Sequence, residues 1–367
     1  MDILQLLRLA KSERASDLHL VVTRPPIMRV DGSLRIVANM PPLTPDDMDE
    51  LFNQITTEEE RESFRRRPEL DFSYTAPDVG RLRCNVARQL GTISLVIRLL
   101  PITIPTIEEL GLPKICKELV LKPRGLVVIS GPTGSGKSTT LAAMISHLNT
   151  VSSIESRRVV TIEDPVEYVY FNQNCTITQR ELGSDTLSFA EALRHVLRQD
   201  PDVILIGEMR DTETAAAALT IAETGHLVLT TGHASSASGA IERVIDLFPP
   251  HERHLAQARL ASVLLGVLCQ ALIPKCEESG RVVAVEVMLA NSAIRNLIRE
   301  GKLFQLSNTI RTHVREGMQL RDQELVKLYR DGKISHEDLY AFCSDSEEIE
   351  RLLNTREDKL LSVQSSY

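Results

Sequence analysis

The residues with the clearest chemical meaning form a glycine-rich run that ends in lysine and serine. Residues 131–138, Gly-Pro-Thr-Gly-Ser-Gly-Lys-Ser, match the pattern G-x-x-x-x-G-K-[ST] in full. An apolar run, residues 126–130, precedes them, and a helical pattern, residues 139–148, follows. In that context the glycines let backbone N–H groups turn towards phosphate oxygens, and the helix N-terminus adds partial positive charge. The sequence therefore predicts a P-loop that binds the phosphates of a nucleotide.

The individual residues of this loop have separate expected roles. Lys137 is predicted to reach the β- and γ-phosphates, and the Ser138 hydroxyl is predicted to bind Mg²⁺. The expected cofactors are thus ATP and Mg²⁺. The predicted nucleotide-binding residues are Gly131, Pro132, Thr133, Gly134, Ser135, Gly136, Lys137, Ser138 and Thr139.

Acidic residues follow two further apolar runs, and both are candidates for the chemistry. Glu208 ends Val-Ile-Leu-Ile-Gly-Glu, and Glu163 ends Val-Thr-Ile-Glu. The carboxyl end of a parallel strand faces the crevice where ligands bind. Glu208 suits a role in holding Mg²⁺ or its water, and either Glu163 or Glu208 can orient or deprotonate the attacking water. For Asp164 and Glu167, close behind Glu163, a solvated turn is the plain alternative.

Two histidines flank another predicted strand. His226 precedes Leu-Val-Leu-Thr-Thr, and His233 follows it by two residues. A single histidine is more often structural than catalytic. Two histidines at the ends of a strand can instead sense the γ-phosphate, so His226 and His233 are both candidate catalytic residues.

These groups need a sheet that brings the strand ends together. Apolar runs separated by helical segments lie at residues 126–130, 159–162, 203–206 and 227–230, and this pattern indicates a parallel sheet covered on both faces. The apolar run at residues 260–274 is too short for a membrane span of about 20 residues, so we expect a buried core helix there. The N-terminus lacks the basic start and cleavage site of a signal peptide, and we expect a soluble chain.

A separate α+β domain is predicted at residues 1–100. Its signals include a hairpin that turns at Asp31-Gly32 and a helix capped by Thr44. Three prolines then break regular structure and predict a linker at residues 101–113, which leaves residues 114–367 as the second domain. The length of 367 residues agrees with two domains, since single cores usually stop growing below this size.

Charge and cysteine content narrow the class of protein. The chain has 42 basic and 50 acidic residues, which gives a net charge of −8. After residue 100 there are 28 basic and 35 acidic residues, so most of the excess acid lies in the second domain. This balance argues against nucleic acid as the main partner, because such proteins usually carry an electropositive face. The six cysteines include no C-x-x-C pair, which favours reduced thiols in a cytosolic protein over a zinc site or a disulfide framework.

Beyond these patterns, nearly the whole chain resembles the PilT-type retraction ATPases of type IV pili, within the secretion-ATPase superfamily of GspE/PulE-like P-loop NTPases. The segments that carry the resemblance are residues 131–140, 161–168, 198–211, 218–226 and 293–302. The last, Ala-Ile-Arg-Asn-Leu-Ile-Arg-Glu-Gly-Lys, is similar to a motif typical of retraction-type members. The resemblance implies an α/β protein: an N-terminal PAS-like α+β domain, then a RecA-like P-loop ATPase domain with a mainly parallel central sheet and C-terminal helices.

The resemblance also implies a function. It predicts a homohexameric motor that hydrolyses ATP to power pilus retraction and twitching motility, cytoplasmic and peripherally associated with the inner-membrane pilus machine. The implied partners are a platform protein of that membrane and a sister retraction ATPase, with no nucleic acid. Arg83 and Arg98 match arginines that reach phosphates across a subunit boundary, and Arg81 is a reserve candidate. The plain alternative for each is a solvated arginine on a strand face.

Taken without the resemblance, residues 293–302 predict an ordinary amphipathic surface helix, capped by Asn291 or Ser292 and ended by Gly301. Its apolar stripe is formed by isoleucine and leucine. The residues expected to face outward are Arg295, Asn296, Arg299 and Glu300.

One departure from the family pattern leaves alternatives open. Residues 231–234 read Thr-Gly-His-Ala, where the family commonly reads Thr-Leu-His-Thr, so an accessory or weakly active paralogue of the motor is a rival reading. A secretion or DNA-translocation ATPase is another, although no basic run exists beyond Arg65–Arg67. Assembly and secretion relatives usually carry a tetracysteine zinc insertion that the stretch around Cys269 and Cys276 lacks, which favours the retraction side.

Overall fold

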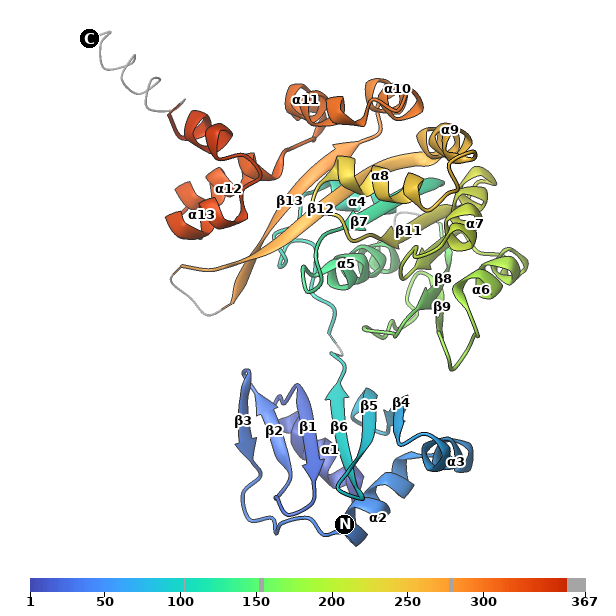
Figure 1. Cartoon of the computed structure of the whole chain (residues 1–367), viewed down its shortest axis with the longest axis vertical. Helices are drawn as coiled ribbons and strands as arrows, with labels where there is room; N and C mark the ends of the chain where they lie inside the picture. Colours follow the sequence, from blue (N-terminus) through green and yellow to red (C-terminus); the bar gives the residue numbers. More distant parts are fainter. Residues whose placement is uncertain (102, 152–154, 277–279, 355–367) are drawn as a thin grey trace. The chain divides into compact units, whose positions relative to one another are not determined.

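The computed structural model describes the whole chain except residues 102, 152–154, 277–279 and 355–367 (Figure 1). It divides into two compact units, with residues 1–103 in the first and nearly all of residues 104–367 in the second. The predicted linker at residues 101–113 contains residue 102, which lies outside the described residues.

The first unit is an antiparallel sheet with helices on one face. The strand order is β3-β2-β1-β6-β5-β4. Apolar side chains alternate along the strands and meet those of the helices in one core, which leaves the polar residues on the opposite face. The elements are α1 (Ile3–Ser12), β1 (Asp17–Val21), β2 (Ile27–Val30), β3 (Ser33–Ile36), α2 (Pro45–Ile55), α3 (Glu58–Arg66), β4 (Glu69–Ala76), β5 (Gly80–Gln89) and β6 (Thr92–Leu99).

Two local predictions for this unit are confirmed. β2 and β3 form a hairpin in which Val30 pairs with Ser33, and Asp31 and Gly32 both have positive φ, as a two-residue turn requires. Helix α2 begins at Pro45, and the side chain of Thr44 accepts the backbone N–H of Asp47.

The second unit is built on a seven-stranded sheet in the order β13-β12-β7-β11-β10-β8-β9. All neighbouring strands are parallel except β12 and β13. The strands are β7 (Gly125–Ser130), β8 (Arg158–Glu163), β9 (Thr176–Glu181), β10 (Val203–Ile206), β11 (Leu227–Thr231), β12 (Leu264–Pro274) and β13 (Arg281–Leu289).

Helices cover both faces of this sheet, because its central strands are apolar on both sides (Figure 1). One core includes residues of α4 and α5, and the other includes residues of α6 to α11. The predicted α/β class and the mainly parallel central sheet are therefore confirmed. The helices are α4 (Ile115–Val120), α5 (Lys137–Thr150), α6 (Phe189–Val196), α7 (Thr212–Glu223), α8 (Ala237–Asp246), α9 (Arg253–Val263), α10 (Ser292–Arg299), α11 (Leu306–Thr312), α12 (Arg321–Arg330) and α13 (His336–Phe342).

The prediction of a buried core helix at residues 260–274 is wrong. Helix α9 ends at Val263, and Leu264–Pro274 form strand β12, between β7 and β13. A short apolar run fits a buried helix and a strand buried on both faces equally well, so periodicity does not separate the two. Within the described part of the chain, no helix combines the length and the apolar character needed to cross a bilayer.

The expected surface helix of the retraction-type motif is α10, and Asn291 caps it through the N–H of Ile294. The prediction that the Arg295 side chain faces outward is wrong, however. Its guanidinium donates hydrogen bonds of 2.5–2.8 Å to four backbone carbonyls. These belong to Ala290, which lies between β13 and α10, and to the junction between α9 and β12, namely Ala261, Ser262 and Leu264. Arg295 therefore ties α10 to the end of α9.

Candidate nucleotide-binding and hydrolysis site

The P-loop connects the end of β7 with the start of α5, as predicted. Gly131, Gly134 and Gly136 all have positive φ, between +78° and +145°, which side chains other than glycine rarely adopt. A Cβ atom on Gly131 would lie only 2.4 Å from the backbone oxygen of Gln270. The glycines are thus required by the path of the loop, which leaves its backbone free to surround an anion.

Two polar side chains of this loop are buried. The Lys137 ammonium donates to the carbonyls of Gly131 at 2.9 Å and Pro132 at 3.1 Å. Burial lowers the pKa of Lys137, and the charge of Glu208 opposes that shift. The hydroxyl oxygen of Ser135 is buried without a hydrogen-bond partner, although such groups are nearly always paired. An unpaired hydroxyl and a buried ammonium in the same loop fit a site that receives a phosphate.

The donor set also fits Mg²⁺. Ser138 is exposed at the second residue of α5 and offers a hydroxyl oxygen. Glu208 offers a carboxylate two residues after β10 ends. Hydroxyl and carboxylate oxygens are the ligands that Mg²⁺ prefers in proteins.

Glu163 is the last residue of β8 and is 8% exposed. Its Oε1 atom accepts hydrogen bonds from the Thr161 hydroxyl at 2.6 Å and from the Gln179 carboxamide at 3.2 Å. Thr161 and Glu163 lie two residues apart and so share one face of β8, and Gln179 comes from the adjacent strand β9. The carboxylate is therefore held in one orientation at the carboxyl edge of the sheet.

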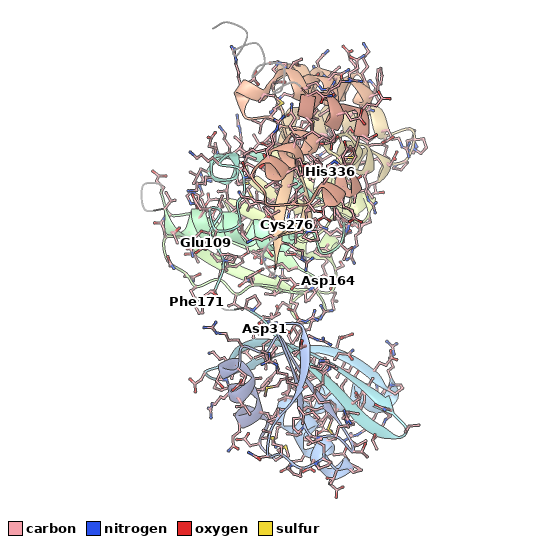
Figure 2. The ribbon with its side chains drawn as sticks, turned by 90° about the vertical axis from the view of Figure 1, so that its left-hand side faces the viewer. Asp31, Glu109, Asp164, Phe171, Cys276 and His336 are labelled. Carbon is pink, nitrogen blue, oxygen red and sulfur yellow. The ribbon has the colours of Figure 1, made fainter. Side chains whose placement is uncertain are left out.

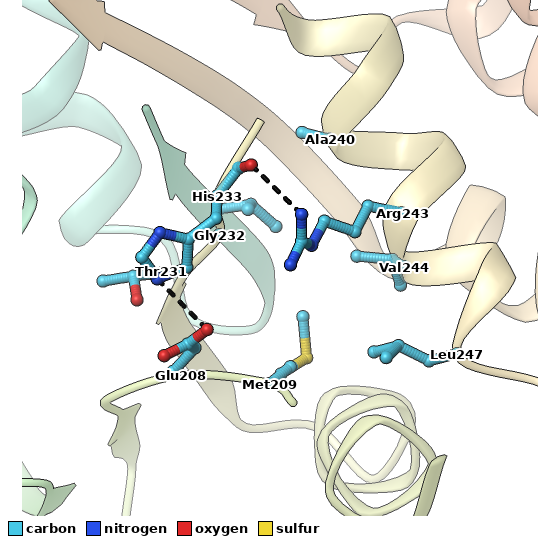
Figure 3. Close-up of a pocket in the computed structure, with 10 residues that line it drawn as sticks. Glu208, Met209, Thr231, Gly232, His233, Ala240, Arg243, Val244 and Leu247 are labelled. Carbon is cyan, nitrogen blue, oxygen red and sulfur yellow. Dashed lines mark hydrogen bonds and ion pairs between the residues drawn. The ribbon is translucent and has the colours of Figure 1, made fainter. Parts of the chain in front are cut away.

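The carboxylate of Glu208 is held by two basic side chains. Oε2 accepts from Nε of Arg210 at 2.6 Å, and Oε1 lies 3.1 Å from Nε2 of His233 (Figure 3). Burial alone would raise the pKa of Glu208, but the hydrogen bond from Arg210 and the charge of His233 outweigh it and lower that pKa. Arg210 also lies 3.5 Å from Asp164, labelled in Figure 2, which follows β8. Glu208 is thus kept ionised.

A small pocket lies behind this pair, between the ends of β10 and β11 and helix α8. Met209, Val244 and Leu247 line its apolar side, and Arg243 donates to the backbone oxygen of His233 at 3.4 Å (Figure 3). Gly232 also lines it, and a Cβ atom there would lie 3.3 Å from the Ser130 hydroxyl. A larger residue at position 232 would therefore press on the Ser130 side chain, which would have to shift by a few tenths of an ångström.

The two candidate histidines lie at opposite edges of the sheet. His233 follows the carboxyl end of β11, whereas His226 precedes its amino end. The His226 ring contacts the Thr224 hydroxyl and the Ile221 carbonyl at the end of α7, each at 3.1 Å. At about 3.3 Å per residue, seven residues of extended chain place the two on the order of 20 Å apart. The nucleotide edge of this chain contains His233 and does not contain His226.

The candidate arginines lie on the first unit. Arg83 in β5 and Arg98 in β6 are direct cross-strand partners on the face that the helices leave uncovered. Arg98 also pairs with Asp17 of β1, with Nε 2.9 Å from Oδ1. Asp17 is 5% exposed, so this contact holds the Nε side of the Arg98 guanidinium on a buried carboxylate, while the Arg98 side chain remains 60% exposed.

Several residues of the site were not identified from the sequence: Thr161, Gln179, Arg210 and Arg243. The alternation of strands offered a signal for Thr161, which lies two residues before Glu163 on the same face. Arg210, two residues after Glu208, lay inside a recognised segment. Gln179 and Arg243 lie on β9 and α8, and no local spacing relates them to the residues that they contact.

Comparison with known proteins agrees with this geometry. Residues 5–341 match the family described as Type II/IV secretion system protein. The chain is 46% identical to the type IV pilus retraction ATPase PilT of Pseudomonas aeruginosa, over 92% of this chain and 96% of that protein. It is 40% identical to the twitching motility protein of Neisseria gonorrhoeae, over 92% and 89% respectively. It is also 39% identical to the type IV pilus ATPase PilU of Pseudomonas aeruginosa, over 96% and 91%.

Solved structures show the same likeness. A crystal structure of the pilus retraction motor PilT with bound ADP superposes with a TM-score of 0.89 at 42% identity, over 96% of this chain and 99% of that one. The ATPase DotB of Legionella pneumophila gives 0.75 at 30% identity, over 92% and 94%. The family and fold expected from the sequence are therefore confirmed. The chain belongs to the Type II/IV secretion system protein family, and its activity is that of an ATPase.

Proposed function

We propose that this ATPase is the motor that retracts and depolymerises type IV pili and so supports twitching motility. The observation that carries the proposal is the meeting of the P-loop, Glu163, Glu208 and His233 at one sheet edge, in a chain 46% identical to PilT. ATP is the substrate that this edge accommodates, with the triphosphate in the P-loop.

The residues at this edge have different roles in binding and hydrolysing ATP. Lys137 and the loop N–H groups bind the phosphates, and Ser138 and Glu208 hold Mg²⁺. When bound, Mg²⁺ neutralises charge on the β- and γ-phosphate oxygens. Glu208 is a poor proton acceptor, because Arg210 and His233 already occupy its two oxygens and its pKa is lowered.

Glu163 is the better candidate for the residue that orients and deprotonates water. Thr161 and Gln179 hold one of its oxygens in place. His233 contacts Glu208 and responds to the state of the γ-phosphate through that carboxylate.

The motor is proposed to be a homohexamer. In it Arg83 and Arg98 of one subunit stabilise the phosphates bound by the next, a contribution that can reach about 10³–10⁵ in rate. Its other partners are an inner-membrane platform protein and a sister ATPase, and its location is cytoplasmic, at the periphery of the membrane complex. Nucleic acid is not a partner in this proposal.

Two experiments test the proposal. Light scattering on a sizing column, with an assay of Mg-ATP hydrolysis, should find a hexamer with turnover; a monomer without hydrolysis under all conditions would contradict it. A deletion strain should carry excess pili and lose twitching, whereas a strain without pili would indicate a role in assembly. ATPase activity stimulated by DNA would revive the translocase alternative.

A weakly hydrolysing accessory subunit is the second candidate. It is favoured by the Thr-Gly-His-Ala sequence at residues 231–234, which departs from the family's usual Thr-Leu-His-Thr. The rate of the purified protein distinguishes it, because an accessory subunit binds nucleotide but barely turns it over.

A further inference from the structure

Strand β12 carries a buried glutamine directly behind the P-loop. The parallel pairing of β12 with β7 matches Cys269 with Ser130, so Gln270 stands level with Gly131, the first residue of the loop. Gln270 is 2% exposed. The oxygen and the NH₂ group of a buried carboxamide both need hydrogen-bond partners, since a buried polar group without a partner carries a desolvation cost.

Both ends of this side chain are paired with the nucleotide-binding segment. Oε1 of Gln270 accepts the Thr140 hydroxyl at 2.9 Å, and Nε2 donates to the Ser135 carbonyl at 2.6 Å. Thr140 lies in the first turn of α5 and is itself 2% exposed. One carboxamide therefore joins the loop to its helix and spans the residues between them, Gly136 to Thr139, including the lysine and serine expected to bind phosphate and Mg²⁺.

The bond to Ser135 sets the orientation of a peptide group. In a trans peptide the C=O and the following N–H point in opposite directions. The Ser135 carbonyl points to Gln270, so the N–H of Gly136 points away from β12. A Cβ atom on Gly136 would lie 3.2 Å from Nε2 of Gln270, which shows how closely the carboxamide packs against this peptide.

We propose that Gln270 is a positioning residue of the ATPase, which holds the Ser135–Gly136 peptide with its N–H directed at the bound phosphate. Gln270 itself does not touch the nucleotide; it acts through the loop. The inference rests on the nucleotide-binding function of the P-loop and does not depend on pilus retraction.

The test compares Gln270→Met, which keeps the volume and removes both hydrogen bonds, with wild type in the full-length protein. ADP affinity should weaken about tenfold or more, a change of about 1.4 kcal/mol per factor of ten. KM for ATP should rise by more than kcat falls, because the loss concerns the binding of phosphate. Gln319→Met is the matched control, since Gln319 also donates to a sheet carbonyl, that of Val285 at 2.7 Å, but lies away from the P-loop.

Thr140→Val provides a milder variant in case Gln270→Met fails to fold. It removes only the donor to Oε1 and should weaken ADP binding, while Thr140→Ser, which keeps the hydroxyl, should restore it. Wild-type affinity and KM in folded Gln270→Met or folded Thr140→Val would overturn the inference, and so would an equal loss in Gln319→Met. If wild type itself bound no ADP, the ATPase function would fail instead, so the two failures are distinguishable.

Discussion

The Nε2 atom of His233 lies 3.1 Å from Oε1 of Glu208, so a histidine after β11 contacts a carboxylate after β10. The two strands are adjacent and parallel, which brings these ends together without any long side chain. Arg210 holds the other carboxylate oxygen. Glu208 is therefore held by a basic side chain on each of its two oxygens.

Replacing His233 should leave one oxygen of the Glu208 carboxylate without its partner. His233→Ala is expected to lower kcat by about 10–10²-fold, because a hydrogen bond to a charged group contributes about 1.5–3 kcal/mol, while ADP affinity stays within a few-fold of wild type. Steady-state kinetics and calorimetric ADP titration measure the two effects. His251→Ala is a matched control, because His251 pairs with Glu252 on the surface at 3.3 Å. A similar loss in both variants would contradict the role of His233.

The carboxylate at the end of β8 is expected to matter for turnover and not for binding. Glu163→Gln keeps the shape of the side chain but removes the acceptor of a proton, so kcat should fall by at least about 10² with ADP affinity nearly unchanged. Glu191→Gln, at an exposed carboxylate in the first turn of α6, serves as the control. A rate near wild type in Glu163→Gln would leave Glu208 as the group that activates water.

Glu208→Gln should produce a different defect. Glutamine replaces the charged carboxylate by a neutral carboxamide, which is a weaker ligand for Mg²⁺ and can pair with only one of Arg210 and His233 through its remaining oxygen. We expect the Mg²⁺ concentration for half-maximal ATPase activity to rise severalfold and kcat to fall. A magnesium titration of both glutamate variants separates them, and an unchanged half-maximal concentration in Glu208→Gln would argue against metal binding.

The ion pair between buried Asp17 and exposed Arg98 in the first unit should make stability depend on pH. Burial alone would raise the pKa of Asp17, but hydrogen bonds from Ser16 and Arg98 outweigh it and lower that pKa below 3.8. The carboxylate therefore stabilises the fold above about pH 3.8, and this contribution is lost as the pH falls through the lowered pKa. Asp17→Asn should lower the free energy of unfolding at pH 7 by roughly 1–3 kcal/mol.

Urea unfolding at pH 7 and near pH 3 measures this difference between Asp17→Asn and wild type, which should shrink at the lower pH. Asp31→Asn is the control, because Asp31 is exposed in a turn that asparagine also adopts. A difference that is equal at both pH values would show that the charge of Asp17 is not its source.

Substitution of Arg295 should lower the stability of the fold, even by another basic residue. Arg295→Lys keeps the charge but cannot reach four carbonyls in the same fork, and we expect a loss of about 2–4 kcal/mol in the free energy of unfolding. Arg299→Lys, an exposed position on the same helix, should cost little. Equal effects of the two substitutions in urea unfolding would show that the carbonyl contacts add no stability.

Most residues of the nucleotide-binding edge could be predicted from short sequence patterns. The P-loop requires its glycines in sequence, and the strands before Glu163 and Glu208 are apolar on both sides, so their carboxyl ends were recognisable. Parallel pairing then brings those ends together. His226 was harder to place, because the amino and carboxyl ends of one strand are close in sequence but lie at opposite edges of the sheet.

The remaining errors have a common physical origin. Strand β12 is a short apolar run, and only its neighbours β7 and β13 determine that it is not a helix. Arg295 occupies a helical position that faces outward by periodicity, yet the end of α9 supplies carbonyls that attract its side chain. In both cases a partner remote in the sequence decides the outcome, and a local pattern contains no information about it.

The support of the P-loop by β12 has a consequence for the order in which the protein is made. Gln270 follows Ser135 by 135 residues, so the ribosome completes the loop long before it makes the side chain that orients it. At about 5–20 residues per second, this delay is roughly ten seconds. During that interval the first unit is complete and free to fold, whereas the nascent P-loop lacks its backing strand. Nucleotide should therefore stabilise the finished chain more than a growing one in which β12 has not yet been made.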